Sequence, residues 1–89
     1  MNQIFRTPAP STTLDIDILR SVIAIAESGS IAAAATRVAR TPAAVSMQIK
    51  KLEEMLGRTL FERTRRGMTP TAEGERLLDY ARKMIELNR

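Results

Sequence analysis

The residues best suited to chemistry in this sequence are its lysines and arginines, and most of them lie in the middle third of the chain. Residues 37–66 hold eight basic and three acidic side chains, a net charge of +5, whereas residues 1–36 carry a net charge of −1 and residues 67–89 a net charge of 0. Ammonium and guanidinium groups bind phosphate strongly, so this concentration of charge favours a surface that binds a polyanion. A generally basic, solvated surface is the alternative, but it would not confine the whole excess to one third of the chain.

Catalytic and metal chemistry is nearly excluded by the residues that are missing. The 89 residues include no cysteine and no histidine, so neither a zinc site nor a Ser–His or Cys–His nucleophile pair can form. Paired carboxylates and a glycine-rich phosphate loop are missing as well. We therefore expect no enzyme activity, no catalytic residue, no metal and no cofactor.

Composition and length predict one small helical domain. Hydrophobic residues make up 44% of the sequence but aromatic residues only 3%, so the core must be built from Leu, Ile, Val, Met and Ala, which favours packed helices over a β-sandwich. No apolar run is long enough to span a bilayer, and the N-terminus lacks the charged start and apolar core of a secretory signal. We therefore expect a cytoplasmic protein that does not enter a membrane.

Residues 41–56 are predicted to form the helix that presents part of this charge. Thr41 suits the N-cap, Pro42 suits the first helical position, and Gly57 follows the last apolar residue as a stop signal. Apolar side chains recur at helical spacing and predict one buried stripe of Val45, Ile49, Leu52 and Leu56. The opposite face carries Ala43, Ser46, Met47, Lys50 and Glu54. Because this face is short and polar at its N-terminal end and then cationic, it is typical of a recognition helix that enters a DNA major groove; an ordinary amphipathic surface helix is the alternative.

Two helices are predicted before it. Asp15 can cap a helix over residues 15–28 that Gly29 ends, and Ser30 can cap a short helix over residues 31–39. The apolar stripe of the first comprises Ile18, Leu19, Val22, Ile23, Ile25 and Ala26. Four consecutive alanines in the second allow another helix to pack closely, and the expected contacts join Ala34, Ala35 and Val38 to Val45 and Ile49. A short helix, a short turn and a second helix make a helix-turn-helix outline, although many proteins that do not bind DNA contain one.

A wing is predicted to follow. Residues 60–61 and 68–69 read as two very short strands on either side of a basic turn over residues 63–67. Arg65 and Arg66 lie at the tip, where a glycine permits a tight bend. A cation on such a tip can reach a phosphate or lie in a narrow minor groove; a solvated basic loop is the alternative.

A last helix is predicted over residues 72–89, with Thr71 as its cap. Its apolar face comprises Leu77, Leu78, Ala81, Met84 and Ile85. The helical pattern continues to Arg89 without a stop signal, so we expect a piece of a longer chain, and the helix is longer than so small a core can cover. We therefore expect a homodimer that forms through residues 71–89. Residues 1–13, rich in Pro, Ser and Thr, predict a flexible lead-in, which leaves residues 14–70 as the compact domain.

The run from Leu19 to Gly74 resembles the N-terminal DNA-binding domain of LysR-type transcriptional regulators. The matching pieces, in order, are AESGS, AA, AVSMQIKKLE, LGRTLFER and TAEGERLL. The resemblance implies a winged helix-turn-helix followed by a linker helix that pairs antiparallel in a dimer. It further implies binding to imperfect inverted repeats in double-stranded DNA, often as a tetramer, with a small-molecule effector bound by a C-terminal domain that is absent here.

The resemblance also assigns contacts. The family's recognition-helix contacts fall on Thr41, Pro42, Ala43, Ser46 and Met47, and its minor-groove contact falls on Arg66. Lys50 and Arg65 join this set from the charge pattern described above. Two positions depart from the family, because Pro42 replaces a polar residue and Met47 replaces the arginine that many members carry. Direct base readout should therefore be thinner, with more reliance on phosphate contacts and DNA shape.

Two other functions fit part of the pattern. A winged helix used for protein–protein contact tends to lose the cationic wing and recognition face, so the basic residues argue against it. Molybdate-responsive regulators have a closely similar N-terminal domain and differ in C-terminal sequence.

Overall fold

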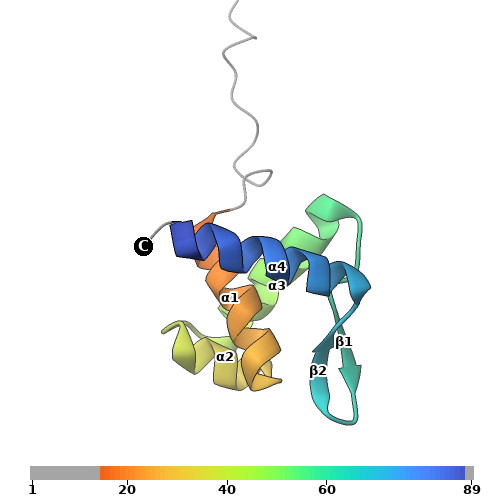
Figure 1. Cartoon of the computed structure of the whole chain (residues 1–89). Coiled ribbons are helices and arrows are strands. Elements are labelled where there is room, and N and C mark those ends of the chain that lie inside the picture. The colour runs from red at the N-terminus through yellow and green to blue at the C-terminus, as the bar shows by residue number, and fades with distance from the viewer. Residues whose placement is uncertain (1–14, 88–89) are drawn as a thin grey trace, which may run out of the picture.

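The computed structural model describes residues 15–87, which form four helices and one two-stranded antiparallel sheet (Figure 1). In chain order the elements are α1 (Ile16–Ser28), α2 (Ile31–Arg37), α3 (Pro42–Leu56), β1 (Phe61–Thr64), β2 (Gly67–Pro70) and α4 (Ala72–Leu87). The other three helices all pack against α1. The prediction of a mainly helical winged helix-turn-helix followed by a long helix is therefore confirmed. The predicted lead-in over residues 1–13 lies outside the described residues, as do the last two residues of the helix predicted over 72–89.

The four helices begin where the sequence predicts, each at a side chain that accepts a hydrogen bond from an early backbone N–H. The pairs are Asp15 Oδ1 with the Ile18 N–H at 2.9 Å, Ser30 Oγ with Ala33 at 2.9 Å, Thr41 Oγ1 with Ala44 at 3.1 Å, and Thr71 Oγ1 with Gly74 at 3.0 Å. Gly29 and Gly57 take left-handed conformations and close α1 and α3. These signals lie within a few residues of the ends they set, which is why sequence reasoning finds them.

The core lies where α1, α2 and α3 meet, with side chains from the wing and α4 closing it. Val22 and Ile25 of α1 are completely buried, as are Ala34 of α2 and Val45 of α3. Because Ala34 and Ala35 add almost no bulk, α2 approaches its neighbours closely, as the alanine run predicts. Leu60 and Phe61 at the start of the wing are also buried in this core.

One helix boundary and one burial assignment in the helix-turn-helix differ from the prediction. The helix expected over residues 31–39 ends at Arg37, because Val38 caps it and Ala39 turns into the left-handed region at φ +59°. Leu56, expected in the buried stripe of α3, is 41% exposed. It belongs to the last turn of α3, which extends past the core and lines a surface groove beside α4.

The wing is a β-hairpin of two four-residue strands joined by a two-residue turn. Phe61 pairs with Pro70 and Thr64 pairs with Gly67, so the strands are longer than predicted and the turn contains only Arg65 and Arg66. Arg63, expected in the basic turn, instead lies in β1. The reason is that a two-residue connection is enough when a glycine follows it, and the ladder then continues to the turn.

The wing is joined to the end of α1 through backbone atoms. The Met68 N–H donates to the Gly29 carbonyl oxygen at 2.9 Å, and a Cβ placed on Gly67 would lie 2.4 Å from that same oxygen. Gly67 also has a φ of +112°, a conformation that L side chains rarely adopt. Sequence reasoning gave Gly67 only the bend, whereas the structure shows that it also permits this close approach.

The start of α4 is joined to the wing in a similar way. The Thr71 N–H donates to the Leu60 carbonyl at 2.9 Å, and the Thr71 hydroxyl donates to the Thr59 carbonyl at 2.6 Å. A Cβ on Gly74 would lie 2.1 Å from the Leu60 carbonyl oxygen. Gly74 therefore weakens the helix locally but allows α4 to lie directly on the chain that enters β1.

Two residues of the predicted dimer face belong to the core of the single chain. Leu78 is 1% exposed and Ala81 is 0% exposed, and α4 packs along α1 (Figure 1). These two side chains therefore cannot supply surface to a second copy, and their assignment to dimerisation is wrong. Leu77, Met84 and Ile85 are partly exposed.

The left-handed turn after α2 predicts a stabilising substitution. Ala39 occupies the position after the cap where glycine is usual, and the Arg40 N–H closes the motif by donating to the Ala35 carbonyl at 2.9 Å. We expect Ala39→Gly to raise the free energy of unfolding by up to about 1 kcal/mol, since relief of the strained φ outweighs the added entropy of the unfolded chain. Ala33→Gly, at an exposed helical position, should instead lower it by about 1 kcal/mol. Urea unfolding of both variants tests this, and equal destabilisation would contradict it.

The contact between Gly67 and Gly29 predicts that alanine substitutions at two glycines differ in their effect on stability. Gly67→Ala should lower the free energy of unfolding by about 3–5 kcal/mol, because the new methyl group meets backbone in addition to the unfavourable φ. Gly57→Ala is the matched control, because its φ is +68° but nothing lies within 4 Å of the added Cβ, and it should cost about 1–2 kcal/mol. Urea unfolding, with amide hydrogen exchange at Met68, measures both effects. Equal destabilisation of the two variants would mean that the wing is not held at this point.

Candidate nucleic-acid interface

The N-terminal half of α3 presents an exposed face of short side chains. Six residues at the cap and in the first turns of this helix are predicted to contact DNA, and all six are exposed: Thr41, Pro42, Ala43, Ser46, Met47 and Lys50. On the other side, Val45, Ile49 and Leu52 are buried. Apart from Leu56, the helix thus divides as predicted, and the first two turns can come close to another molecule because no long side chain stands in front of them except Met47.

A hydrogen bond from a buried serine also holds α3 against α1. Ser21 is 0% exposed, and its hydroxyl donates to Oε1 of Gln48 at 2.6 Å. Sequence reasoning did not identify this pair. The signal that was available is the position of Ser21 in the apolar stripe of α1, one turn before Ile25, because a polar side chain on a buried face requires a partner.

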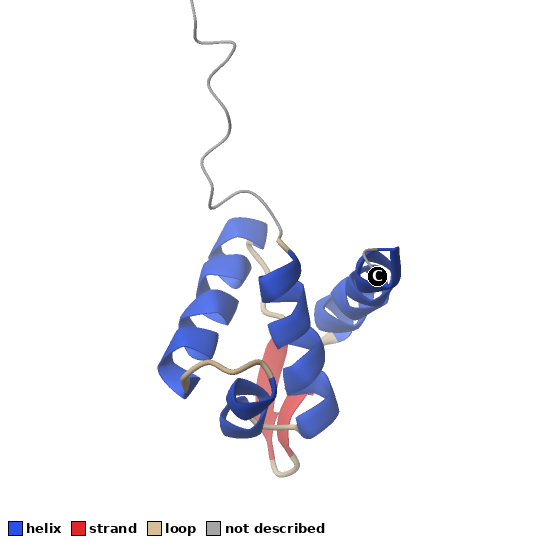
Figure 2. Ribbon diagram, turned by 90° about the vertical axis from the view of Figure 1, so that its left-hand side faces the viewer, coloured by secondary structure: helices blue, strands red, loops and turns tan. Residues whose placement is uncertain are grey.

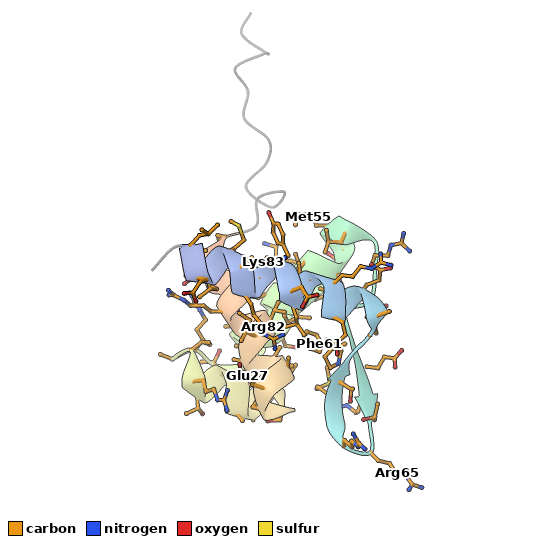
Figure 3. The ribbon with its side chains drawn as sticks, in the orientation of Figure 1. Glu27, Met55, Phe61, Arg65, Arg82 and Lys83 are labelled. Atoms are coloured by element: carbon orange, nitrogen blue, oxygen red, sulfur yellow. The ribbon has the colours of Figure 1, made fainter. Side chains whose placement is uncertain are left out.

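The wing turn carries two exposed arginines on a braced backbone. The Thr64 hydroxyl lies 2.9 Å from that of Thr69 and 3.2 Å from the Gly67 carbonyl oxygen, and it accepts from the Arg66 N–H at 3.2 Å. Arg65 extends from the tip of the hairpin into solvent (Figure 3). The bracing fixes the backbone at Arg66 while its side chain remains exposed.

The wing turn and the start of α3 lie at the same end of the molecule. Figure 2 shows the loop that enters α3 and the turn of the hairpin both at the lower end, with α4 set to one side. The start of α3 and the wing turn therefore lie toward the same end of the domain, as a single interface requires.

Ion pairs divide the basic residues into two groups. Arg37 pairs with Glu27 at 3.0 Å and Arg40 pairs with Asp17 at 2.8 Å, which joins α2 and the following turn to α1. Within residues 15–87, no ion pair involves Lys50, Lys51, Arg65 or Arg66. Other cations, on α1, on α4 and in the loop before the wing, are also unpaired there, so α3 and the wing hold part of the positive charge left for a polyanion.

The described part of the chain offers little else as a site. Residues 15–87 contain no cluster of three acidic side chains able to hold a metal ion. Over the same residues, each helix is either too short or too polar to cross a bilayer.

The sequence matches a known family over most of its length. Residues 16–75 match the model of the bacterial regulatory helix-turn-helix proteins of the lysR family. The chain is 43% identical over 82 residues to the HTH-type transcriptional regulator PecT of Dickeya dadantii, covering 92% of this chain and 26% of PecT. It is 47% identical over 73 residues to the HTH-type transcriptional regulator DgdR of Burkholderia cepacia, covering 82% of this chain and 25% of DgdR. It thus spans about a quarter of the length of these relatives.

Solved structures share the fold at similar levels of identity. A CbnR_DBD–DNA complex matches with a TM-score of 0.78 and 39% identity, covering 84% of this chain and 86% of that chain. A BenM_DBD/benA site 1 DNA complex matches with a TM-score of 0.76 and 34% identity, covering 82% of each. The curated relatives are named as transcriptional regulators, which agrees with the expectation that this chain is not an enzyme. The chain belongs to the LysR family of bacterial regulatory helix-turn-helix proteins and corresponds to the DNA-binding domain of that family.

Proposed function

We propose that this domain binds double-stranded DNA with sequence preference, with the first turns of α3 in the major groove and the wing turn at the adjacent minor groove. The observation that carries the proposal is that α3, whose first turns are exposed and short-chained, begins toward the same end of the molecule as the wing turn, whose two arginines have no ion-pair partners in residues 15–87. Two structures that share its fold are complexes with DNA. Both grooves are reached by one rigid unit because the wing is hydrogen-bonded to the end of α1.

The environment of each exposed residue suggests its role. The Thr41 hydroxyl accepts a hydrogen bond as the cap of α3 and keeps its proton free to donate to a phosphate. Ser46 has no side-chain hydrogen bond within residues 15–87, so it can bond a base edge. Lys50 follows one turn later and suits a phosphate. Arg66 suits the minor groove and Arg65 the phosphates beside it.

A protein partner for the same surface is less well supported. Winged helices that bind proteins tend to lose the cationic wing and recognition face, whereas Lys50, Lys51, Arg65 and Arg66 are present here and have no ion-pair partner in residues 15–87. Titration with a library of duplex DNA distinguishes the two functions.

We further propose that the domain pairs with a second copy through an apolar stripe on the outer side of α4. Leu77, Tyr80, Met84 and Leu87 recur at heptad spacing, next to the stripe that α4 buries against α1. Tyr80 is 50% and Leu87 is 84% exposed. The proposed dimer face thus shares Leu77 and Met84 with the face predicted from the sequence and adds Tyr80 and Leu87. Ile85 lies nearer the side of α4 that is buried against α1.

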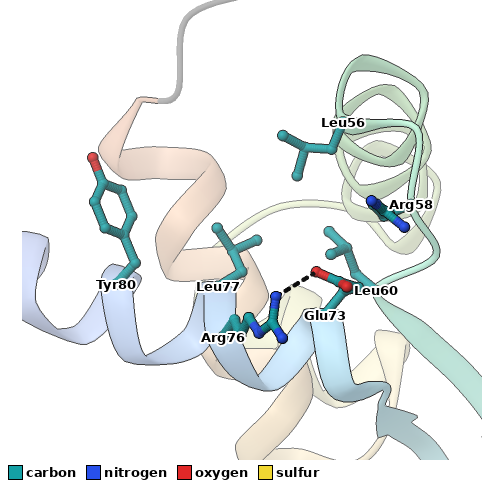
Figure 4. Close-up of a pocket in the computed structure, with 7 residues that line it drawn as sticks. All are labelled: Leu56, Arg58, Leu60, Glu73, Arg76, Leu77 and Tyr80. Atoms are coloured by element: carbon teal, nitrogen blue, oxygen red, sulfur yellow. Dashed lines mark ion pairs between the residues drawn. The ribbon is translucent and has the colours of Figure 1, made fainter.

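A groove beside this stripe offers a place for a partner side chain. It has a volume of about 280 Å³ and is lined by Leu56, Leu60, Leu77 and Tyr80, with Arg58, Glu73 and Arg76 at its edges (Figure 4). In the antiparallel pairing that the family resemblance implies, the C-terminal half of one α4 lies against the N-terminal half of the other. The exposed Leu87 of the second copy would then approach this groove.

Pairing would double the recognition surface. Two copies related by a two-fold axis read two half-sites, so we expect an imperfect inverted repeat. The proposed setting is the bacterial cytoplasm, where the chromosome lies. In a protein of the length of the relatives, tetramer formation and effector binding would belong to the remaining residues.

The first prediction concerns salt and the wing. The affinity for a duplex selected from random sequences should fall as salt rises, and Arg66→Ala should weaken binding roughly tenfold and lower the salt slope by about one. Arg82→Ala is the control, because helical spacing puts Arg82 on the face of α4 opposite the proposed stripe, and it should change the slope less. Fluorescence anisotropy across a salt series measures both. Salt-independent binding would contradict phosphate contact, and an unchanged Arg66 variant would remove the wing from the interface.

The second prediction concerns the dimer. Tyr80→Asp should weaken self-association by tenfold or more, since it places a charge in an apolar interface, and DNA affinity should fall with it. Arg82→Gln makes the same net charge change of −1 on another side of the same helix and should leave association unchanged. Sedimentation equilibrium with circular dichroism separates loss of pairing from loss of fold. A wild-type domain that stays monomeric at high concentration, with or without DNA, would count against this interface.

A further inference from the structure

Met47 is an exposed apolar side chain in the middle of the proposed DNA-facing surface. Four large hydrophobic side chains are exposed in residues 15–87, and Met47, at 60%, is one of them. The other three are Leu56, Tyr80 and Leu87, which belong to the groove and stripe proposed for a second copy. Met47 alone is left without an assigned apolar partner.

The neighbours of Met47 make a small apolar patch. Ala43 lies one turn before it on the same face of α3, and Pro42 lies beside Ala43; both are exposed. The patch is bordered by the Ser46 hydroxyl and by the Lys50 ammonium group. Contact with the centre of this face therefore favours an apolar group on the ligand.

The patch itself holds no arginine or lysine, Lys50 at its border is proposed above to contact phosphate, and the amide of this region is occupied elsewhere. Arginine or lysine at the base edge makes the bidentate contact to guanine. The bidentate contact to adenine uses both the amide oxygen and the NH₂ group of an Asn or Gln side chain. The amide in the first two turns of α3 is that of Gln48, which is only partly exposed, and its oxygen accepts from the buried Ser21 hydroxyl. Gln48 is thus held toward α1 and cannot present both groups to adenine.

We propose that Met47, with Ala43 beside it, recognises the C5-methyl group of thymine, and that thymine methyl positions distinguish the preferred half-site. The inference rests on the proposed DNA binding and names the feature of DNA that the surface reads. Among the standard bases, only thymine offers an apolar group in the major groove. The flexible thioether side chain of methionine adapts readily to such a group.

Deoxyuridine substitution tests this directly, because it removes the methyl group and leaves base pairing unchanged. Starting from a duplex selected from random sequences, each thymine is replaced in turn by deoxyuridine and binding is measured by anisotropy. We expect a loss of about fourfold at one or two positions in each half-site, the effect of one buried methyl group. At these positions a 5-methylcytosine–guanine pair should bind about fourfold better than a cytosine–guanine pair.

Variants assign the effect to the residue. Met47→Ala should abolish the deoxyuridine sensitivity at one of these positions, and Met47→Leu should preserve it. Glu54→Ala, on the exposed face two turns further along α3, is the matched control and should leave the pattern unchanged. Equal binding of thymine and deoxyuridine duplexes at every position, or full sensitivity in Met47→Ala, would overturn the proposal. A wild-type domain that binds no selected duplex would overturn the proposed function itself, and this result appears before any base is modified.

Discussion

The orientation of α3 about its own axis is the constraint on which the other features depend. A helix turns by about 100° per residue, so a modest rotation would bury Ser46 and Met47 and expose the core. Three buried side chains, Val45, Ile49 and Leu52, oppose such a rotation, and each contributes on the order of 1.5–3 kcal/mol. The exposed ion pair between Arg40 and Asp17 contributes no more than about 1 kcal/mol. The core therefore sets the orientation, and the Ser21–Gln48 hydrogen bond makes it specific.

Glycine extends this control from α3 to the wing and α4. Gly67 allows β2 to lie against the Gly29 carbonyl, and Gly74 allows α4 to lie against the Leu60 carbonyl. Each contact joins backbone to backbone, so it leaves less freedom than contact between flexible side chains. The proposed base-reading helix, minor-groove wing and pairing helix are thus fixed relative to one another. In a dimer, this rigidity would convert the pairing of two α4 helices into a defined separation of two recognition surfaces.

Features encoded locally could be predicted from the sequence, whereas features that depend on distant contacts could not. Asp15, Ser30, Thr41 and Thr71 cap their helices because a cap acts within three residues. The two faces of α3 follow from periodicity, and only Leu56 departs, because the core ends before α3 does. In α4 two apolar stripes lie side by side, and periodicity alone does not show which one meets α1. For that reason periodicity places the buried Leu78 and Ala81 on the dimer face and omits Tyr80 and Leu87 of the proposed stripe.

The charge pattern shows the same limit. Residues 37–66 were expected to act as one basic region, but Arg37 and Arg40 pair with Glu27 and Asp17 of α1. These partners are ten and twenty-three residues away along the chain, outside residues 37–66. A charge count over residues 37–66 therefore includes the two arginines but not the carboxylates that pair with them. The cations of this region that are unpaired within residues 15–87 include Lys50 and Lys51 of α3 and Arg65 and Arg66 of the wing turn, the two elements on which the proposed interface rests.

The most direct measurement is an NMR titration of the isotope-labelled domain with a selected duplex, in which backbone amide shifts are followed residue by residue. The account predicts that the largest shifts cluster at residues 41–51 and 64–67 and appear together at the same DNA concentration. Shifts confined to α4 and residues 56–60, with α3 and the wing turn unaffected, would contradict it.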